Sequence, residues 1–401
     1  MPDDSSAQLP IDRRLLLGAA GLAGIAALSA TRVKAGPLNP PAGAVGSTGK
    51  TITEAEPRTA INATNTPGDA DSVFRIGQAG SYYLTANLMA TTGKNGIKIA
   101  ASGVTLDLNG FQIGSFGGLA AIVPSSTAVE RIVIRNGRIF GTAGGILLDA
   151  IPGVVVEGVS VESCSGYGIR VGPQSHLREC VAIDNSIGMF AGDGSCIRDC
   201  RAAANSSIGI STGDACTISG CASFDNGSDG ISAGTSCVLT ACACKSNTAN
   251  GIRTSNTATV IGCSAEFNDA DGISASYNST IVDCTAFANE SDGISAQRAC
   301  LIQRNSCISN GSETAGSGIR VTFDECRIEG NNCIRNYRGI YVSGPNNFIA
   351  ANTCSHSTLV NWEIDAGNQC LVVVGVNAAA ISGDSGGSSP GSTNPWANFT
   401  F

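Results

Sequence analysis

The hydrophobic residues of this chain recur in short alternating groups at an interval of about 21 residues. Each group opens with a glycine followed by an aliphatic residue. In Gly168-Ile169-Arg170-Val171 the alternation predicts Ile169 and Val171 on an inner face and Arg170 on an outer face. The interval is marked by Gly145, Gly168, Gly188, Gly209, Gly230, Gly251, Gly272, Gly293, Gly318 and Gly339, with Gly96 and Ala121 in the same phase before them. A self-similar period of this length predicts a solenoid.

Each interval has room for three short strands and their turns. We therefore expect an all-β solenoid of parallel coils, about twelve of them, between roughly residues 95 and 362. Residues 72–113 and 360–381 are expected to cap its two ends and so prevent pairing of exposed strand edges. No amphipathic helix stands out.

Cysteine and asparagine follow the same period. The cysteine columns are Cys180, Cys200, Cys221, Cys242, Cys263 and Cys284, drifting to Cys307, Cys333 and Cys354, and a further set of Cys196, Cys216, Cys237, Cys300 and Cys326. The asparagine column is Asn185, Asn205, Asn226, Asn247, Asn268, Asn289 and Asn310. Equivalent residues stack about 4.8 Å apart in parallel coils, so we expect buried thiol ladders and a hydrogen-bonded amide ladder at one turn. None of the 17 cysteines forms the paired spacing of a zinc site.

The first 35 residues have the order of regions found in export signals. Arg13 and Arg14 precede an apolar run from Leu15 to Ala30, and small residues around Ala35 offer a cleavage site. The paired arginines favour the twin-arginine (Tat) route over the general secretory route, and the run is too short for a stable membrane span. We expect a signal at 1–35, a linker at 36–71, the solenoid at 72–381 and a Gly/Ser/Pro-rich tail at 382–401.

The formal net charge of −8 excludes nucleic acid as an expected partner, because that class of binding depends on an excess of Lys and Arg. The low fraction of aromatic residues, 5%, counts against a processive carbohydrate enzyme. An acidic surface suits secretion, and it is also what solubility alone produces.

Two segments near the start of the solenoid carry a family resemblance. Gly80-Ser81-Tyr82-Tyr83-Leu84, followed by Val104-Thr105-Leu106-Asp107-Leu108-Asn109-Gly110, resembles the opening of carbohydrate-associated β-helix domains. With the stacked columns, the chain looks like a bacterial right-handed parallel β-helix repeat protein of the pectate-lyase-like superfamily. That resemblance implies a right-handed coil. The superfamily includes lyases, polygalacturonases, epimerases and adhesins, so the fold does not choose the reaction.

The catalytic motifs of two of these classes are absent from the sequence. The Asn-Thr-Asp and Gly-His-Gly motifs of polygalacturonase-like members do not occur, nor does the Asp-Pro-His-Asp motif of mannuronan epimerases. The two histidines, His176 and His356, lie in distant coils, and we expect both on the surface.

The candidate chemistry lies in the column directly before the repeat glycine. Asp229, Asn250, Asp271 and Asp292 occupy it, with Asp269 and Glu290 two positions earlier in their coils. Asp271 and Asp292 should lie about 5 Å apart, which raises one pKa or recruits a cation. Asp269, Asp271, Glu290 and Asp292 are thus candidate ligands for calcium. Asp-Gly is also ordinary turn chemistry, which leaves a purely structural role open.

A second column, two residues after the glycine, should face outward. It contains Arg170, Ser211, Ser232, Arg253, Ser274, Ser295, Arg320 and Tyr341. A lyase needs a base and a positive charge for its enolate, and Asp229, Asp271 and Asp292 beside Arg253 could supply them. The least regular step, from Gly293 to Gly318, inserts residues 312–316 next to Asp292, and an active site usually breaks a repeat locally, so we expect any site to lie there. The sequence thus leaves open two functions for an exported protein, namely binding or lyase-like cleavage of an extracellular acidic polysaccharide, and a non-catalytic structural or binding role at the cell surface.

Overall fold

The computed structural model describes residues 56–115, 117–312, 314–370, 372–374 and 396–400. The predicted signal at 1–35 and most of the predicted linker and tail lie outside these residues. The described chain contains strands and turns only, and within it no helix is long and apolar enough to cross a membrane.

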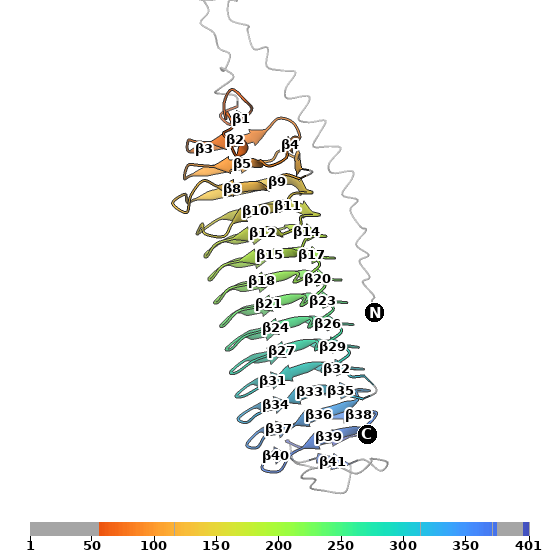
Figure 1. The fold of residues 1–401 in the computed structure, drawn as a ribbon. Helices are drawn as coiled ribbons and strands as arrows, with labels where there is room; N and C mark the ends of the chain where they lie inside the picture. The colour runs from red at the N-terminus through yellow and green to blue at the C-terminus, as the bar shows by residue number, and fades with distance from the viewer. Residues whose placement is uncertain (1–55, 116, 313, 371, 375–395, 401) are drawn as a thin grey trace, which may run out of the picture. The chain divides into compact units, whose positions relative to one another are not determined.

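The strands stack as parallel coils, as Figure 1 shows. A 14-stranded sheet takes one strand from each coil: β2 (Ser72–Ile76), β5 (Asn95–Ile99), β8 (Ala120–Pro124), β10 (Gly144–Leu148), β12 (Tyr167–Val171), β15 (Ile187–Ala191), β18 (Ile210–Thr212), β21 (Ile231–Ala233), β24 (Ile252–Thr254), β27 (Ile273–Ala275), β30 (Ile294–Ala296), β33 (Ser317–Val321), β36 (Arg338–Val342) and β39 (Val360–Ile364).

The other strands form a 28-stranded sheet that wraps the remaining sides of each coil. Its first strands are β1 (Thr59–Ile61), β3 (Gly80–Leu84), β4 (Leu88–Ala90), β6 (Val104–Asp107), β7 (Gln112–Ser115), β9 (Ile132–Phe140), β11 (Val155–Glu162), β13 (His176–Arg178), β14 (Val181–Ile183), β16 (Cys196–Arg198), β17 (Arg201–Ala203), β19 (Thr217–Ser219), β20 (Ala222–Phe224), β22 (Val238–Thr240) and β23 (Ala243–Lys245). It continues with β25 (Thr259–Ile261), β26 (Ser264–Glu266), β28 (Thr280–Val282), β29 (Thr285–Phe287), β31 (Leu301–Gln303), β32 (Ser306–Ile308), β34 (Arg327–Glu329), β35 (Asn332–Ile334), β37 (Phe348–Ala350), β38 (Thr353–Ser355), β40 (Gln369–Cys370), β41 (Val372–Val374) and β42 (Asn398–Thr400).

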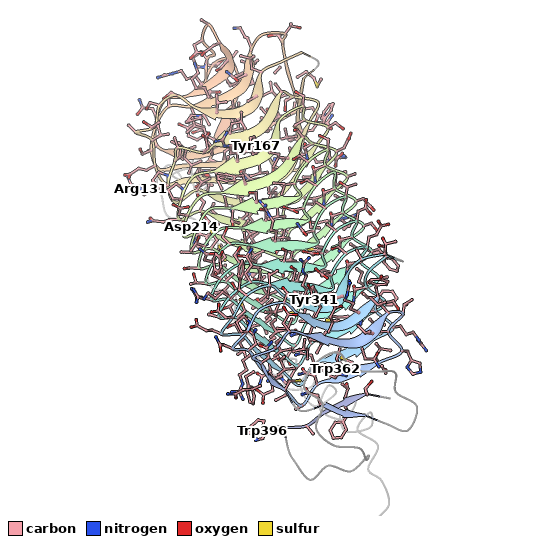
Figure 2. All side chains as sticks on the ribbon, turned by 60° about the horizontal axis from the view of Figure 1, so that its bottom comes forward. Arg131, Tyr167, Asp214, Tyr341, Trp362 and Trp396 are labelled. Atoms are coloured by element: carbon pink, nitrogen blue, oxygen red, sulfur yellow. The ribbon has the colours of Figure 1, made fainter. Side chains whose placement is uncertain are left out.

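The stack is longer than the repeat glycines indicate, with about 15 turns instead of the predicted twelve. Residues 72–113 were expected to be a cap, but their strands pair in parallel with the following coils, as in Phe74 beside Ile97. Strand β1 lies within the predicted linker and β42 within the predicted tail, and both are paired in the large sheet. At the other end Trp362 of β39 is 1% exposed and fills the last described coil of the small sheet (Figure 2).

The inner face carries a column of isoleucines in register. Ile252, Ile273 and Ile294 occupy equivalent positions in β24, β27 and β30 and are fully buried. The repeat glycines follow from this stacking, since a Cβ on Gly272 would lie 2.6 Å from both the Gly293 carbonyl oxygen and the Asn289 amide nitrogen. Glycine is therefore required at this position of each 21-residue repeat, because the next coil approaches too closely for a Cβ.

The predicted cysteine ladders are confirmed as internal, with two changes of register. Fifteen of the 17 thiols are buried, and the described residues contain no disulfide. In the coil after Cys284, the ladder position is occupied by Asn305, whose Oδ1 accepts from the Cys284 N–H. Cys307 lies two residues further along and pairs with Ala286 instead. Cys196 is half-buried in the outer register beside His176, and Ser195 occupies the ladder position instead.

The asparagine ladder is continuous from Asn185 to Asn336. At each step the backbone N–H and the side-chain amide of one asparagine both donate to the Oδ1 of the next, as from Asn226 to Asn247 at 3.2 and 2.9 Å. The side-chain amide of Asn247 also donates to the carbonyl of Ser223 in the preceding coil, at 3.2 Å. This buried network satisfies turn groups that strand pairing leaves open.

Candidate functional site

The acidic column lies at the turn that leads into the 14-stranded sheet. Its members are linked from coil to coil, because Asp229 Oδ1 accepts from the Asn250 side chain at 2.9 Å, and Asn250 Oδ1 accepts from the Asp271 N–H at 3.2 Å. Asp271 Oδ1 in turn accepts from the Asp292 N–H at 3.1 Å. The structure thus brings together Asp229, Asp271 and Asp292 in one line, as the spacing predicts.

The four candidate calcium ligands do not converge. Asp269 and Glu290 are exposed, whereas Asp292 is 2% exposed and Asp271 half-buried. Asp271 Oδ1 is already occupied by a backbone N–H. Within the described part of the chain, no three His, Cys, Asp or Glu side chains are grouped to hold a metal ion. Calcium needs six to eight oxygen ligands, so these residues do not fit a calcium site.

Asp292 has an unusual electrostatic environment. Burial raises the pKa of its carboxyl to about 7, and the negative charge of Asp271 in the preceding coil adds to this, while Arg320 opposes it. Its Oδ1 is buried and has no hydrogen-bond partner in the described structure. A carboxyl with this pKa exchanges its proton near neutral pH.

Two arginines of the outward column are held by buried members of the acidic column. Arg253 Nε lies 3.0 Å from Asp229 Oδ2, and Arg320 Nη1 lies 3.6 Å from Asp292 Oδ2. Both guanidiniums remain about half exposed, whereas the two carboxylates are nearly inaccessible. Asp229 therefore orients Arg253 at hydrogen-bond distance, and Asp292 forms a longer ion pair with Arg320. Both guanidiniums keep outer N–H groups available to a ligand.

A groove of about 430 Å³ lies between these arginines on the outer face of the 14-stranded sheet. Strand register places Arg253 beside Ser274, Ser274 beside Ser295, and Ser295 beside Arg320. The arginine backbones are therefore three coil steps apart, about 14 Å. The groove is lined by Ser232, Ala233, Arg253, Thr254, Ser255, Ser274, Ala275, Ser276, Ser295, Gln297, Arg320 and Thr322. We name it the Arg253–Arg320 groove.

The sequence-based selection of site residues was incomplete at one end of this groove. Arg320 was recognised as an outward residue but not as a partner of the acidic column. It follows the irregular step at 312–316, where a site was expected, so that signal was present. His176 and His356 are both exposed and lie outside the groove, in agreement with their prediction as surface residues.

Comparisons with known proteins agree with this architecture. A family model described as "Right handed beta helix region" matches residues 74–222 and 206–361. No curated protein sequence matches the chain significantly.

Solved structures with a similar fold include two enzymes. The A-module of the Azotobacter vinelandii mannuronan C-5 epimerase AlgE4 is 17% identical and has a TM-score of 0.54, over 67% of this chain and 90% of that one. The catalytic unit of a GH87 alpha-1,3-glucanase from Streptomyces thermodiastaticus is 10% identical and has a TM-score of 0.53, over 85% of this chain and 70% of that one. At these identities the likeness shows the fold alone.

Proposed function

The chain belongs to the right handed beta helix region family, and on that premise we propose that it is an exported protein that binds an acidic polysaccharide in the Arg253–Arg320 groove. The observation that carries the proposal is the pair of half-exposed guanidiniums, each paired with a buried aspartate, at the two ends of a serine-lined groove.

The charge of the groove selects the class of ligand. Its lining contains two arginines and no Asp or Glu, although the chain as a whole has a net charge of −8. A guanidinium matches the planar geometry of a carboxylate with two parallel hydrogen bonds. The serine and threonine hydroxyls between the arginines both donate and accept, which suits sugar hydroxyls. A polymer with carboxylated sugars satisfies both features.

The fold neighbours support a polysaccharide over other anions. Two of them are named for action on mannuronan and on alpha-1,3-glucan. An open groove across several coils also suits an extended polymer better than a small enclosed metabolite.

A second candidate function is lyase-like cleavage in the same groove, favoured by the hydrogen-bonded line of aspartates beside Arg253. The carboxyl of Asp292 has a pKa of about 7, but it is only 2% exposed. Its burial keeps it from direct contact with a polymer, so in a lyase the half-buried Asp271 would remove the proton and Arg253 would stabilise the developing enolate. We place binding first because the two most buried acids of the column, Asp229 and Asp292, pair with arginines and do not open into the groove.

The test is titration of the full chain with soluble polygalacturonate and polymannuronate. Charge-assisted hydrogen bonds contribute about 1.5–3 kcal/mol each, so Arg253→Gln or Arg320→Gln should weaken binding roughly tenfold to a hundredfold. Arg198→Gln is the matched control, because Arg198 is similarly exposed but lies outside the groove. Unchanged affinity in both groove variants would refute the proposal.

The same samples distinguish binding from cleavage. Unsaturated products detected by ultraviolet absorbance would establish the lyase, and Asp271→Asn should then abolish turnover while retaining binding. Binding without products, with the same loss in the arginine variants, establishes the non-catalytic function.

A further inference from the structure

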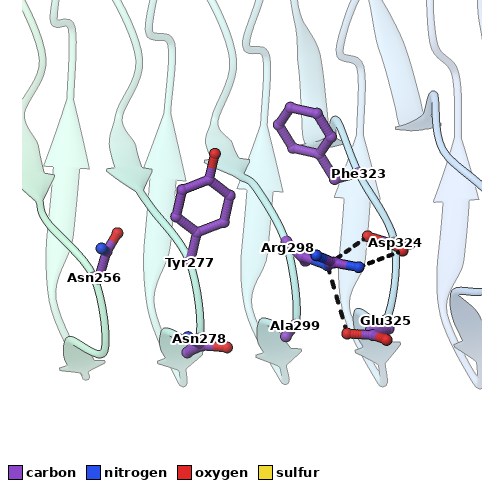
Figure 3. Close-up of a pocket in the computed structure, with 8 residues that line it drawn as sticks. All are labelled: Asn256, Tyr277, Asn278, Arg298, Ala299, Phe323, Asp324 and Glu325. Carbon is purple, nitrogen blue, oxygen red and sulfur yellow. Dashed lines mark hydrogen bonds and ion pairs between the residues drawn. The ribbon is translucent and has the colours of Figure 1, made fainter.

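An aromatic pair lies next to the Arg253–Arg320 groove, on the same coils. Tyr277 and Phe323 are 40% and 48% exposed, and their ring centroids are 6.3 Å apart with planes inclined by 40°. They line a cavity of about 880 Å³ together with Asn256, Asn278, Arg298, Ala299, Asp324 and Glu325 (Figure 3). We name this cavity the Tyr277–Phe323 site.

Phe323 lies in a turn where the repeat is locally broken. Ala296 aligns with Val321, and Cys300 donates its N–H to the thiol of Cys326, so this turn holds one residue more than the turn before it. The carbonyl of Phe323 accepts from the buried side chain of Asn347 at 3.0 Å, and Gly344 of the next coil leaves room for it, since a Cβ there would lie 2.6 Å from that oxygen. The phenyl ring is therefore presented on a fixed backbone, which lowers the entropic cost of binding.

The polar side of the site is a closed ion cluster. Arg298 lies on the coil between those of Tyr277 and Phe323, and in Figure 3 its guanidinium points toward Asp324 and Glu325. Its Nε is 2.8 Å from Asp324 Oδ1 and 3.5 Å from Glu325 Oε2. One guanidinium faces two carboxylates, and the rest of the lining is uncharged, which leaves the site with a net charge of −1. Such a site repels a carboxylated sugar but offers acceptors and donors to hydroxyl groups.

The two sites are contiguous. Ser255, Gln297 and Thr322 line the groove, and their immediate successors Asn256, Arg298 and Phe323 line the Tyr277–Phe323 site. Successive residues are 3.8 Å apart, so one extended chain can occupy both.

From this geometry we infer that the Tyr277–Phe323 site is a second subsite, which binds a neutral sugar unit of the same polymer by stacking on Tyr277 and Phe323 and by hydroxyl contacts with the Arg298 cluster. The inference rests on the proposed function of the groove. It narrows the ligand from a uniform polyuronate to a polysaccharide that contains both acidic and neutral sugars. Aromatic rings with a few fixed polar groups are the usual lining of such pockets.

The experiment measures the affinity of the full chain for three soluble probes: polygalacturonate, which is acidic throughout; hyaluronan, which alternates acidic and neutral sugars; and cellohexaose, which is neutral. We expect hyaluronan to bind more tightly than polygalacturonate. The double variant Tyr277→Ala/Phe323→Ala should weaken hyaluronan and cellohexaose binding about tenfold or more and leave polygalacturonate binding unchanged. Tyr277→Phe should behave like the wild type, because it keeps the ring.

The control variant is Phe267→Ala, which removes an aromatic ring of similar exposure, 45%, outside both sites. Wild-type affinities for all three probes in the Tyr277→Ala/Phe323→Ala variant would overturn the subsite, as would an equal loss in Phe267→Ala. This result is distinguishable from a failure of the proposed groove function. If the groove does not bind acidic polysaccharide, polygalacturonate binding will be unchanged in Arg253→Gln and Arg320→Gln. Salt provides a second readout, because it should weaken binding in the groove and leave cellohexaose binding unaffected.

Discussion

Replacing Asp292 by Asn should change how the stability of the coils around it depends on pH. The wild-type carboxyl has a pKa of about 7 when folded, against an ordinary value of 3.8. Between these two values the folded state retains a proton that the unfolded state has lost. Stability therefore falls as pH rises through this window, which is the opposite of the usual behaviour of a salt-bridged aspartate.

The size of the effect follows from the pKa difference. About three pKa units at 1.36 kcal/mol each amount to about 4 kcal/mol, fully expressed above pH 7 and absent below about pH 4. Asn has nearly the same shape and does not ionise. The Asp292→Asn variant should thus match the wild type near pH 4 and exceed its stability by up to about 4 kcal/mol at pH 8.

Hydrogen exchange of nearby amides is the appropriate assay, because coils of a solenoid can open locally without global unfolding. The N–H of Gly272 donates to the Asp292 carbonyl at 2.8 Å, so it reports directly on this turn. Asp269→Asn serves as the control, since Asp269 is exposed two residues before Asp271. Parallel pH profiles for the wild type and Asp292→Asn would refute the electrostatic argument, as would a profile for Asp269→Asn that departs equally.

Two further predictions concern the ladder and the export signal. Asn247→Ala removes four hydrogen bonds and leaves the buried backbone N–H of Asn226 without an acceptor, although the Asn226 side chain keeps its bond to Ser223 Oγ. We therefore expect a loss of about 3 kcal/mol in denaturant unfolding, against little change for the exposed Asn256→Ala; equal effects would contradict the role of the ladder. Arg13→Lys/Arg14→Lys should retain the protein in the cytoplasm if export uses the twin-arginine route, and undiminished export, measured by cell fractionation, would exclude that route.

The regular part of the fold was predictable because every coil satisfies the same constraints. A glycine appears wherever the next coil approaches too closely for a Cβ, and that requirement is visible in the sequence as a period. The first coil escaped notice because β2 carries Val73 where later coils carry glycine. Without a repeat glycine, the alternating hydrophobic residues of β2 resemble those of any edge strand. Strand β42 was missed for a related reason, since Asn398 accepts from Asn352 across 46 residues and breaks the period.

The candidate site was predictable only where it obeyed the repeat. Asp229, Asp271 and Asp292 occupy equivalent positions before the repeat glycine, Arg253 lies in the outward column beside them, and their proximity followed from counting. Counting also places Tyr277 and Phe323 in one column, each five residues after its repeat glycine and two coils apart. The approach of their ring centroids to 6.3 Å did not follow, because the coil spacing separates their backbones by about 9.6 Å with Arg298 between them. Such side-chain approaches depend on turn geometry, which the spacing of hydrophobic residues does not encode.

The strand register gives the groove a further property. The distance between the Arg253 and Arg320 backbones is an integral number of coils, since only Ser274 and Ser295 lie between them. Each coil bonds only to its immediate neighbours, so duplication of one 21-residue unit between the arginines would lengthen the groove by one increment of about 4.8 Å and leave the rest of the solenoid intact. On the proposed function, the distance between the two arginines changes only in steps of one coil, and homologous solenoids that gain or lose whole coils would match polymers of different charge spacing.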